Sequence, residues 1–132
     1  MRPNTLAEAI ERIRAGEPQE FALAEFVDSF YAAAGADAQY SSIEQEPVRV
    51  TDARLNALAG AIAEYLAKQY RLRCVPKWVS QPWRRLDEPW FTTSSTEPAM
   101  REYLAYASPA EFRSRNIFTE ERPLRRARAK LA

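Results

Sequence analysis

The sequence predicts a mainly α-helical fold: a single-domain, irregular bundle of about five helices, interrupted by a loop segment rich in proline and tryptophan. Apolar residues recur every three to four positions in several segments, and helix start and stop signals flank these segments. The chain has 132 residues, 46% hydrophobic and 28% charged, which suits one core rather than two. We expect the helical domain to span residues 1–118 and a basic tail to follow at 119–132.

Two helices are expected at the N-terminal end. The first covers about residues 5–15, because Thr5 and Glu8 have the spacing of a capping box and a glycine follows. The second covers about residues 18–34 and begins with proline, at a position where no amide donor is needed. The polar residues 36–50 are expected to form an irregular connector.

The strongest helical pattern lies at about residues 52–70, with Thr51 as the expected cap. Its apolar face is formed mainly by Leu55, Leu58, Ala59, Ile62, Tyr65 and Leu66. Residues 72–96 differ in character, because prolines punctuate them and all three tryptophans lie there. Closely spaced prolines divide a helix into single turns, so we expect short turns and extended pieces that the tryptophans fasten to the helical core.

Two shorter helices are expected at about residues 97–107 and 109–115. In the first, Met100, Tyr103 and Leu104 are expected to point inward. In the second, Ser108 and Glu111 have capping-box spacing.

The tight Ser-Pro junction between these helices also fits a helix-turn-helix at 97–118. Its second helix would carry Arg113, Arg115 and Asn116 toward bases or phosphates. That helix is short for a recognition helix. A DNA-binding transcriptional regulator is therefore kept as the alternative function and not as the leading one.

The near-zero net charge conceals an asymmetry along the chain. Residues 1–69 carry 6 Lys or Arg and 11 Asp or Glu, whereas residues 70–132 carry 13 and 7. The second half therefore suits an acidic partner, either protein or nucleic acid. Alternatively, the charges of the two halves neutralise each other within the folded protein, which explains the same charge counts without a partner.

The residue types that are missing exclude several kinds of chemistry. Histidine is absent, which excludes Ser-His-Asp and Cys-His arrangements and histidine metal sites. Cys74 is the single cysteine, and the three glycines do not form a phosphate-binding loop. We therefore expect no enzymatic activity and no cofactor. The lack of an apolar run of roughly 20 residues and of a signal peptide favours a cytoplasmic protein without membrane association.

Three weaker candidates for chemistry remain. Asp87 and Glu88 would gain acid–base character if they were buried beside Trp90, although a polar turn explains them equally well. Cys74 lies next to arginines that would activate a thiolate, but a buried apolar role is commoner for such a cysteine. Tryptophans and arginines at 78–91 would suit bases and phosphates, although a packed loop is the favoured interpretation.

The blocks 108–118 and 124–127, with the aromatic stretch 86–91, resemble small uncharacterised bacterial proteins that are common in actinobacteria. Such proteins are often encoded beside a nucleotidyltransferase-like protein of toxin–antitoxin type. The resemblance covers roughly residues 20–127, and its motifs carry no established chemistry. It implies an antitoxin-like role, in which a helical protein binds the neighbouring enzyme and holds it inactive.

The leading hypothesis is therefore a non-enzymatic interaction protein that restrains a protein partner through its C-terminal region. Guanidinium groups would pair with the carboxylates that a nucleotidyltransferase uses to hold metal. The residues expected to contact the partner are Arg113, Arg115, Asn116, Ile117, Phe118, Arg122, Arg125 and Arg126. The tail is expected to be ordered only in part, or by the partner.

Overall fold

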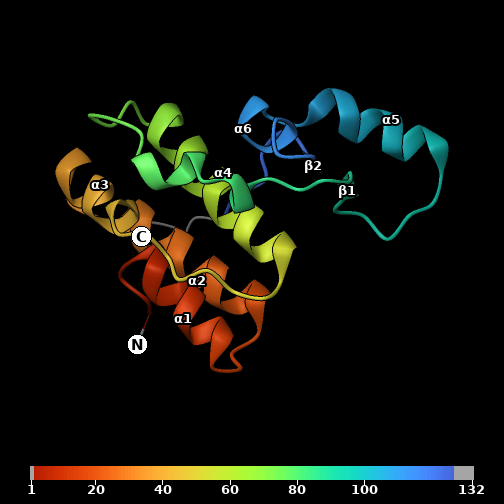
Figure 1. Ribbon diagram of the computed structural model, residues 1–132. Coiled ribbons are helices and arrows are strands. Elements are labelled where there is room, and N and C mark those ends of the chain that lie inside the picture. Colours follow the sequence, from red (N-terminus) through yellow and green to blue (C-terminus); the bar gives the residue numbers. More distant parts are fainter. Residues whose placement is uncertain (1, 127–132) are drawn as a thin grey trace.

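The computed structural model describes residues 2–126 and confirms the predicted fold class, a small and mainly helical protein (Figure 1). The described residues form α1 (Leu6–Arg14), α2 (Gln19–Ala32), α3 (Ala36–Glu44), α4 (Ala53–Gln69), the 3-10 turns η1 (Lys77–Ser80) and η2 (Pro82–Arg84), β1 (Trp90–Phe91), α5 (Pro98–Ala107), α6 (Ala110–Arg113) and β2 (Ile117–Phe118). The Pro/Trp-rich segment consists of short turns and extended pieces, as predicted.

Helix α4 is the centre of the molecule and contacts α1, η1, η2 and α6 (Figure 1). Ten of its 17 residues are buried, and six of those ten are alanine or glycine. Small side chains let neighbouring segments approach the helix axis closely. The predicted cap is shifted by one residue, because Asp52 Oδ1 accepts from Arg54 N at 2.9 Å and the N-cap is Asp52 rather than Thr51.

At Gly60, the side chains of Arg84 and Arg115 approach α4 closely. A Cβ atom at this position would lie 3.0 Å from Arg84 Cβ and 3.0 Å from Arg115 Nε. In the Gly60→Ala variant, overpacking costs about 1–3 kcal/mol, while the gain in helix propensity is only about 1 kcal/mol. We therefore expect a net loss of about 1 kcal/mol in the free energy of unfolding, measured by urea denaturation. A stabilised variant would show that this contact is not tight.

The N-terminal helices α1 and α2 pack against each other, α1 also contacts α4, and Leu6, Ile10, Phe26 and Phe30 join the common core. Thr5 Oγ1 accepts a hydrogen bond from Glu8 N at 3.0 Å, which confirms the predicted cap. The Glu8 carboxylate, in turn, accepts from Asn4 N at 3.0 Å. The first two helices are thus close to their predicted bounds.

The prediction of an irregular connector at 36–50 is wrong in its first part, because residues 36–44 form α3. Only Tyr40 and Ile43 supply apolar side chains to the core from this helix, so its periodicity is weak in sequence. Tertiary contacts stabilise it instead: Trp78 Nε1 donates to Ile43 O at 3.1 Å. Trp78 is buried, which confirms its expected role in fastening the Pro/Trp-rich segment to the helices.

The C-terminal third is built around a parallel pairing of β1 with β2, in which Trp90 faces Ile117 and Phe91 faces Phe118. Sequence patterns did not predict these strands. The expected helix at 109–115 is a single turn, Ala110–Arg113, without a side-chain cap. Ser108 Oγ instead accepts from Thr119 N at 2.8 Å, so the second capping box is also wrong. A four-residue α6 is too short for a recognition helix, and the helix-turn-helix predicted at 97–118 does not form.

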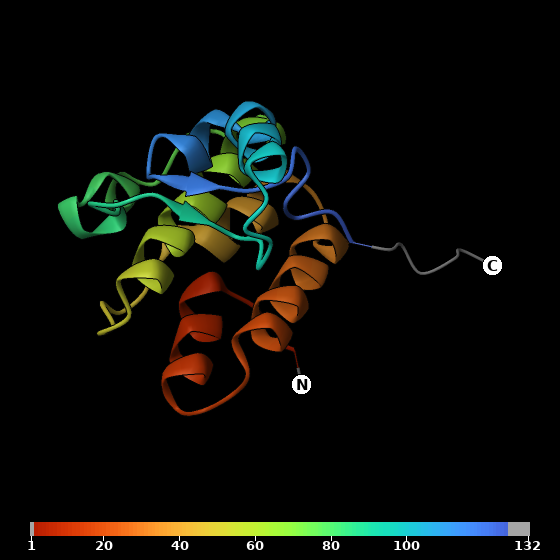
Figure 2. The same ribbon diagram turned by 90° about the vertical axis from the view of Figure 1, so that its right-hand side faces the viewer.

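The first part of the predicted tail packs back onto α2 (Figure 2). Tyr31 Oη donates to Leu124 O at 3.0 Å. Arg126 Nε and Nη2 donate to the two oxygens of Asp28 at 3.0 and 3.2 Å. These contacts fix the chain as far as Arg126, and the prediction for residues 127–132 lies outside the described residues.

Candidate interaction surface

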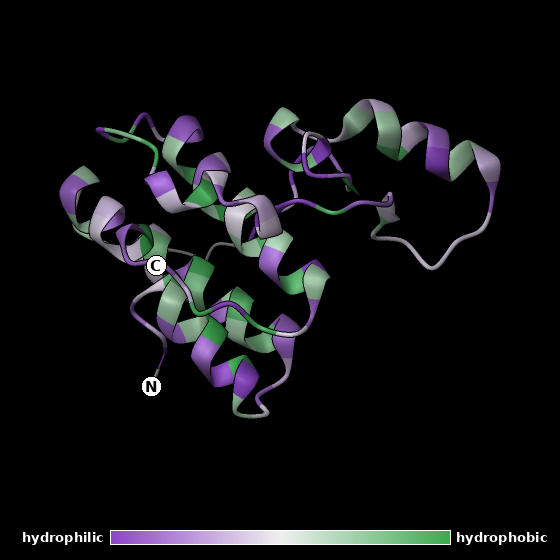
Figure 3. Cartoon of the chain, in the orientation of Figure 1, coloured by the Kyte–Doolittle hydropathy of each residue, from purple (hydrophilic) through white to green (hydrophobic). Residues whose placement is uncertain are grey.

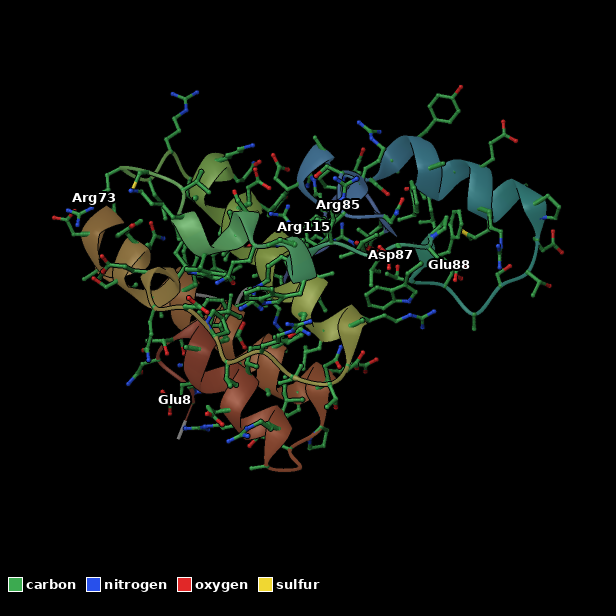
Figure 4. All side chains as sticks on the ribbon, viewed as in Figure 1. Glu8, Arg73, Arg85, Asp87, Glu88 and Arg115 are labelled. Carbon is green, nitrogen blue, oxygen red and sulfur yellow. The ribbon has the colours of Figure 1, made fainter. Side chains whose placement is uncertain are left out.

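Arg115, a predicted partner contact, belongs to the interior of the protein (Figure 4). Its exposed fraction is 7%, and it donates to Glu64 Oε1, to Glu111 O and to Val79 O. The guanidinium therefore joins α4, α6 and η1. The prediction that it contacts a partner is corrected, because the side chain is buried and both Nη1 and Nη2 donate inside the fold.

Three neighbouring residues are likewise committed to internal contacts. Asn116 adopts the left-handed conformation at φ 65°, which Asn tolerates well, and its Nδ2 donates to Leu86 O at 2.7 Å. Ile117 is fully buried. The ring of half-buried Phe118 stacks on Phe91 with centroids 4.9 Å apart. The block 115–118 consequently ties the C-terminal segment to β1, and the continuous surface predicted for 113–118 does not exist.

The remaining predicted cations are on the surface. Arg113 is exposed, and its Nη1 lies 3.4 Å from Ala105 O of α5. Arg122 and Arg125 are also exposed, whereas Arg126 is engaged by Asp28. Of the predicted set, Arg113 is the guanidinium that lies against α5.

Helix α5 carries the largest exposed apolar side chains of the C-terminal third. Met100 is 39% exposed, Tyr103 52% and Tyr106 82%. Leu104 is the one residue of this helix that is buried. The predicted inward orientation therefore holds for Leu104 and is wrong for Met100 and Tyr103.

The position of α5 explains this exposure. Figures 1 and 2 show the helix at one side of the molecule, beyond β1 and β2, at the end of the loop that follows β1. Figure 3 shows hydrophobic segments on this peripheral helix as well as on the central ones. Contacts with β2 hold the helix, and Arg101 lies over the Phe91 ring at 4.9 Å. We call Met100, Tyr103, Tyr106 and Arg113 the α5 surface.

The weaker sequence candidates Asp87, Glu88 and Cys74 all lie on the surface. Asp87 and Glu88 are exposed (Figure 4), so the burial that an acid–base role required is absent. Cys74 is exposed rather than buried, and its Sγ donates to Tyr40 Oη at 3.2 Å. This hydrogen bond, together with burial, raises the pKa of the Tyr40 hydroxyl. Within residues 2–126, His, Cys, Asp and Glu side chains form no group of three or more that could hold a metal ion.

None of the helices in the described part of the chain combines the length and apolar character needed to cross a membrane. The chain matches no protein-family model, no curated protein and no solved structure. The functional proposal consequently rests on the geometry of the α5 surface.

Proposed function

We propose that this protein is a non-enzymatic interaction module that binds a protein partner through the α5 surface. The observation that carries the proposal is the exposure of Met100, Tyr103 and Tyr106 on one helix. Neighbours in this set are three residues apart, so each side chain lies close to the next along the helix. Tyr106 lies on the side of α5 opposite to the buried Leu104. Helices that present such a row of side chains commonly bind in apolar grooves of other proteins.

The chemistry of the surface indicates the kind of groove that would accept it. Tyrosine and methionine are enriched at protein interfaces, because they bury large areas and adapt to the partner. Arg113 adds one exposed guanidinium beside Ala105. A fitting partner therefore presents an apolar groove with a carboxylate at its rim, which pairs with Arg113.

The finer proposal is antitoxin-like. The partner would be a nucleotidyltransferase-like toxin in the cytoplasm, and binding would hold it inactive. Arg113 belongs to the block that carries the family resemblance and is free of internal carboxylates among the described residues. In this role the chain itself needs no metal, cofactor or catalytic residue. Arg122 and Arg125 are candidates for additional contacts, because they are exposed.

Substitution at the most exposed position tests the proposal. We expect Tyr106→Ala to weaken binding of the native partner by about 2 kcal/mol, roughly 30-fold, as for a central interface tyrosine. The free energy of unfolding should change by less than about 0.5 kcal/mol, because Tyr106 is 82% exposed. Quantitative co-purification from the native cell measures the first effect, and urea denaturation the second.

Phe21→Ala is the matched control, because Phe21 is an aromatic residue on α2 with an exposed fraction of 56%. This variant should retain the partner at the parent level. If the parent, Tyr106→Ala and Phe21→Ala all retained the partner equally, the binding site would lie outside the α5 surface. If nucleic acid were recovered instead, and its retention fell steeply with salt, the DNA-binding alternative would replace the proposal.

A further inference from the structure

A second surface feature lies away from α5. A cleft of about 860 Å³ opens between the N-terminal end of α4 and the turn η2. Its polar and aromatic lining consists of Arg49, Thr51, Asn56, Trp83, Arg85 and Asp87. None of these residues belongs to the α5 surface, so the cleft is a separate site.

The walls of the cleft are fixed by hydrogen bonds beneath it. Asn56 Oδ1 accepts from Val50 N at 2.9 Å, and Asn56 Nδ2 donates to Val50 O at 2.8 Å. Arg84 Nη2 donates to Pro47 O at 2.8 Å. The segment 47–50, which has no regular secondary structure, is thereby held against α4 and η2, which fixes the backbone of Arg49. A site that is held in place loses little conformational entropy when a ligand binds.

Two arginines give the cleft its charge. The Arg49 guanidinium lies over the Trp83 ring, with Cζ 4.7 Å from the ring centroid. A stacked guanidinium keeps its in-plane N–H groups available for an anion. Arg85 is exposed (Figure 4), and neither arginine forms an ion pair with any other described residue. Asp87 also lines the cleft and carries the opposite charge, so the charged lining has an excess of one positive charge.

We propose that this cleft binds a phosphate group through Arg49 and Arg85. Phosphate oxygens accept paired N–H donors from guanidinium groups more strongly than neutral acceptors do. The volume fits the range of small-molecule sites and admits a nucleotide. Because Arg49 covers a face of Trp83, recognition relies on the phosphate group rather than on stacking of a base against that face. The phosphate is supplied as the free ion or as the monoester of a nucleotide.

Titration followed by nuclear magnetic resonance tests this site in the full chain. Inorganic phosphate, AMP and adenosine are added in a buffer without phosphate. Phosphate and AMP should shift the Trp83 indole N–H signal and the backbone amide signals of Arg49 and Arg85. Tighter binding of AMP than of phosphate would identify a nucleotide site, and equal binding would identify a site for the free ion. Adenosine should cause no such shifts.

Three variants distinguish this site from general attraction of anions. Arg85→Gln should weaken binding about tenfold, the loss of one charge-assisted contact. Asp87→Asn should tighten binding several-fold, because it removes the opposing carboxylate. Lys77→Ala, which removes an exposed cation outside the cleft, should leave the affinity unchanged. The proposal is overturned if millimolar phosphate and AMP cause no shifts, if adenosine binds as AMP does, or if the Arg85 and Lys77 variants lose affinity equally.

Discussion

Replacement of Arg84 by alanine is expected to lower the free energy of unfolding by about 3–5 kcal/mol, as for other large buried side chains. Arg84 is only 1% exposed and is the largest of the fully buried residues. Its guanidinium donates to Gln81 Oε1 at 3.1 Å and to Pro47 O at 2.8 Å. Alanine leaves a cavity between α4 and η2 and removes the donors for these acceptors. Urea denaturation of the variant and the parent measures the loss.

Arg84→Met is the control that separates packing from charge. Burial lowers the pKa of the Arg84 guanidinium, and attraction by Glu46 only partly opposes this effect. Among the described residues, no carboxylate lies within ion-pair distance of Arg84. Methionine restores much of the volume and removes the cost of burying a charge. We expect it to recover at least half of the stability lost in Arg84→Ala; no recovery would contradict a role based on packing.

The second large effect is expected for Glu64→Leu, which should lower the free energy of unfolding by about 3 kcal/mol. Glu64 is the ion-pair partner of Arg115, whose side chain is 9% exposed, so leucine leaves a buried charge without its carboxylate. The value lies at the lower end of the usual range because the Glu64 side chain is 19% exposed and water reaches it. Urea denaturation should show a lower midpoint with an unchanged slope.

The double variant Glu64→Leu with Arg115→Met is the control for this prediction. It removes both charges and should be more stable than Glu64→Leu alone, since no unpaired guanidinium remains. A double variant that is less stable than the single one would contradict the assignment of the loss to the unpaired charge of Arg115.

The same ion pair makes stability depend on pH. Burial alone would raise the pKa of Glu64, but hydrogen bonds from Lys68 and Arg115 outweigh it and hold the pKa below the ordinary value of a glutamate. Because the pKa is lower in the folded state, this stabilisation is complete above the unfolded pKa and is lost as the pH falls through the folded pKa. The parent should therefore lose more stability than Glu64→Gln as the pH falls below about 5. Urea denaturation of both proteins at each pH measures this difference. Equal losses of stability in the parent and in Glu64→Gln would contradict the assignment to Glu64.

Much of the fold was predictable because α1 and α2 each bury one face, and because α4 is long, rich in alanine and leucine, and buried over most of its circumference. Helix α3 was missed because Tyr40 and Ile43 are its only large buried apolar residues. The pairing of β1 with β2 joins two-residue strands whose paired residues are 27 positions apart, and such short strands have no detectable alternation. Local periodicity thus predicted the long helices and missed the elements that tertiary contacts stabilise.

The functional residues were harder to predict, because exposure depends on distant parts of the chain. Arg115 has the composition of a surface residue, and its burial depends on Glu64, 51 positions away. Gly60 did carry a signal: a glycine within the strongest predicted helix indicates the close approach of another segment. The amphipathic pattern around Met100 and Tyr103 was visible in the sequence. The pattern alone does not indicate whether other parts of the same chain cover these side chains.

Photo-crosslinking tests the central claim, that a protein partner covers the α5 surface, most directly. A photoreactive phenylalanine analogue is placed at position 103, 106 or 21 of the full chain in the native cell. Residues 103 and 106 lie on α5 and residue 21 on α2, and all three are exposed aromatic positions. The account predicts a discrete protein adduct from positions 103 and 106 and none from position 21. The opposite pattern, or a nucleic acid adduct from α5, would contradict it.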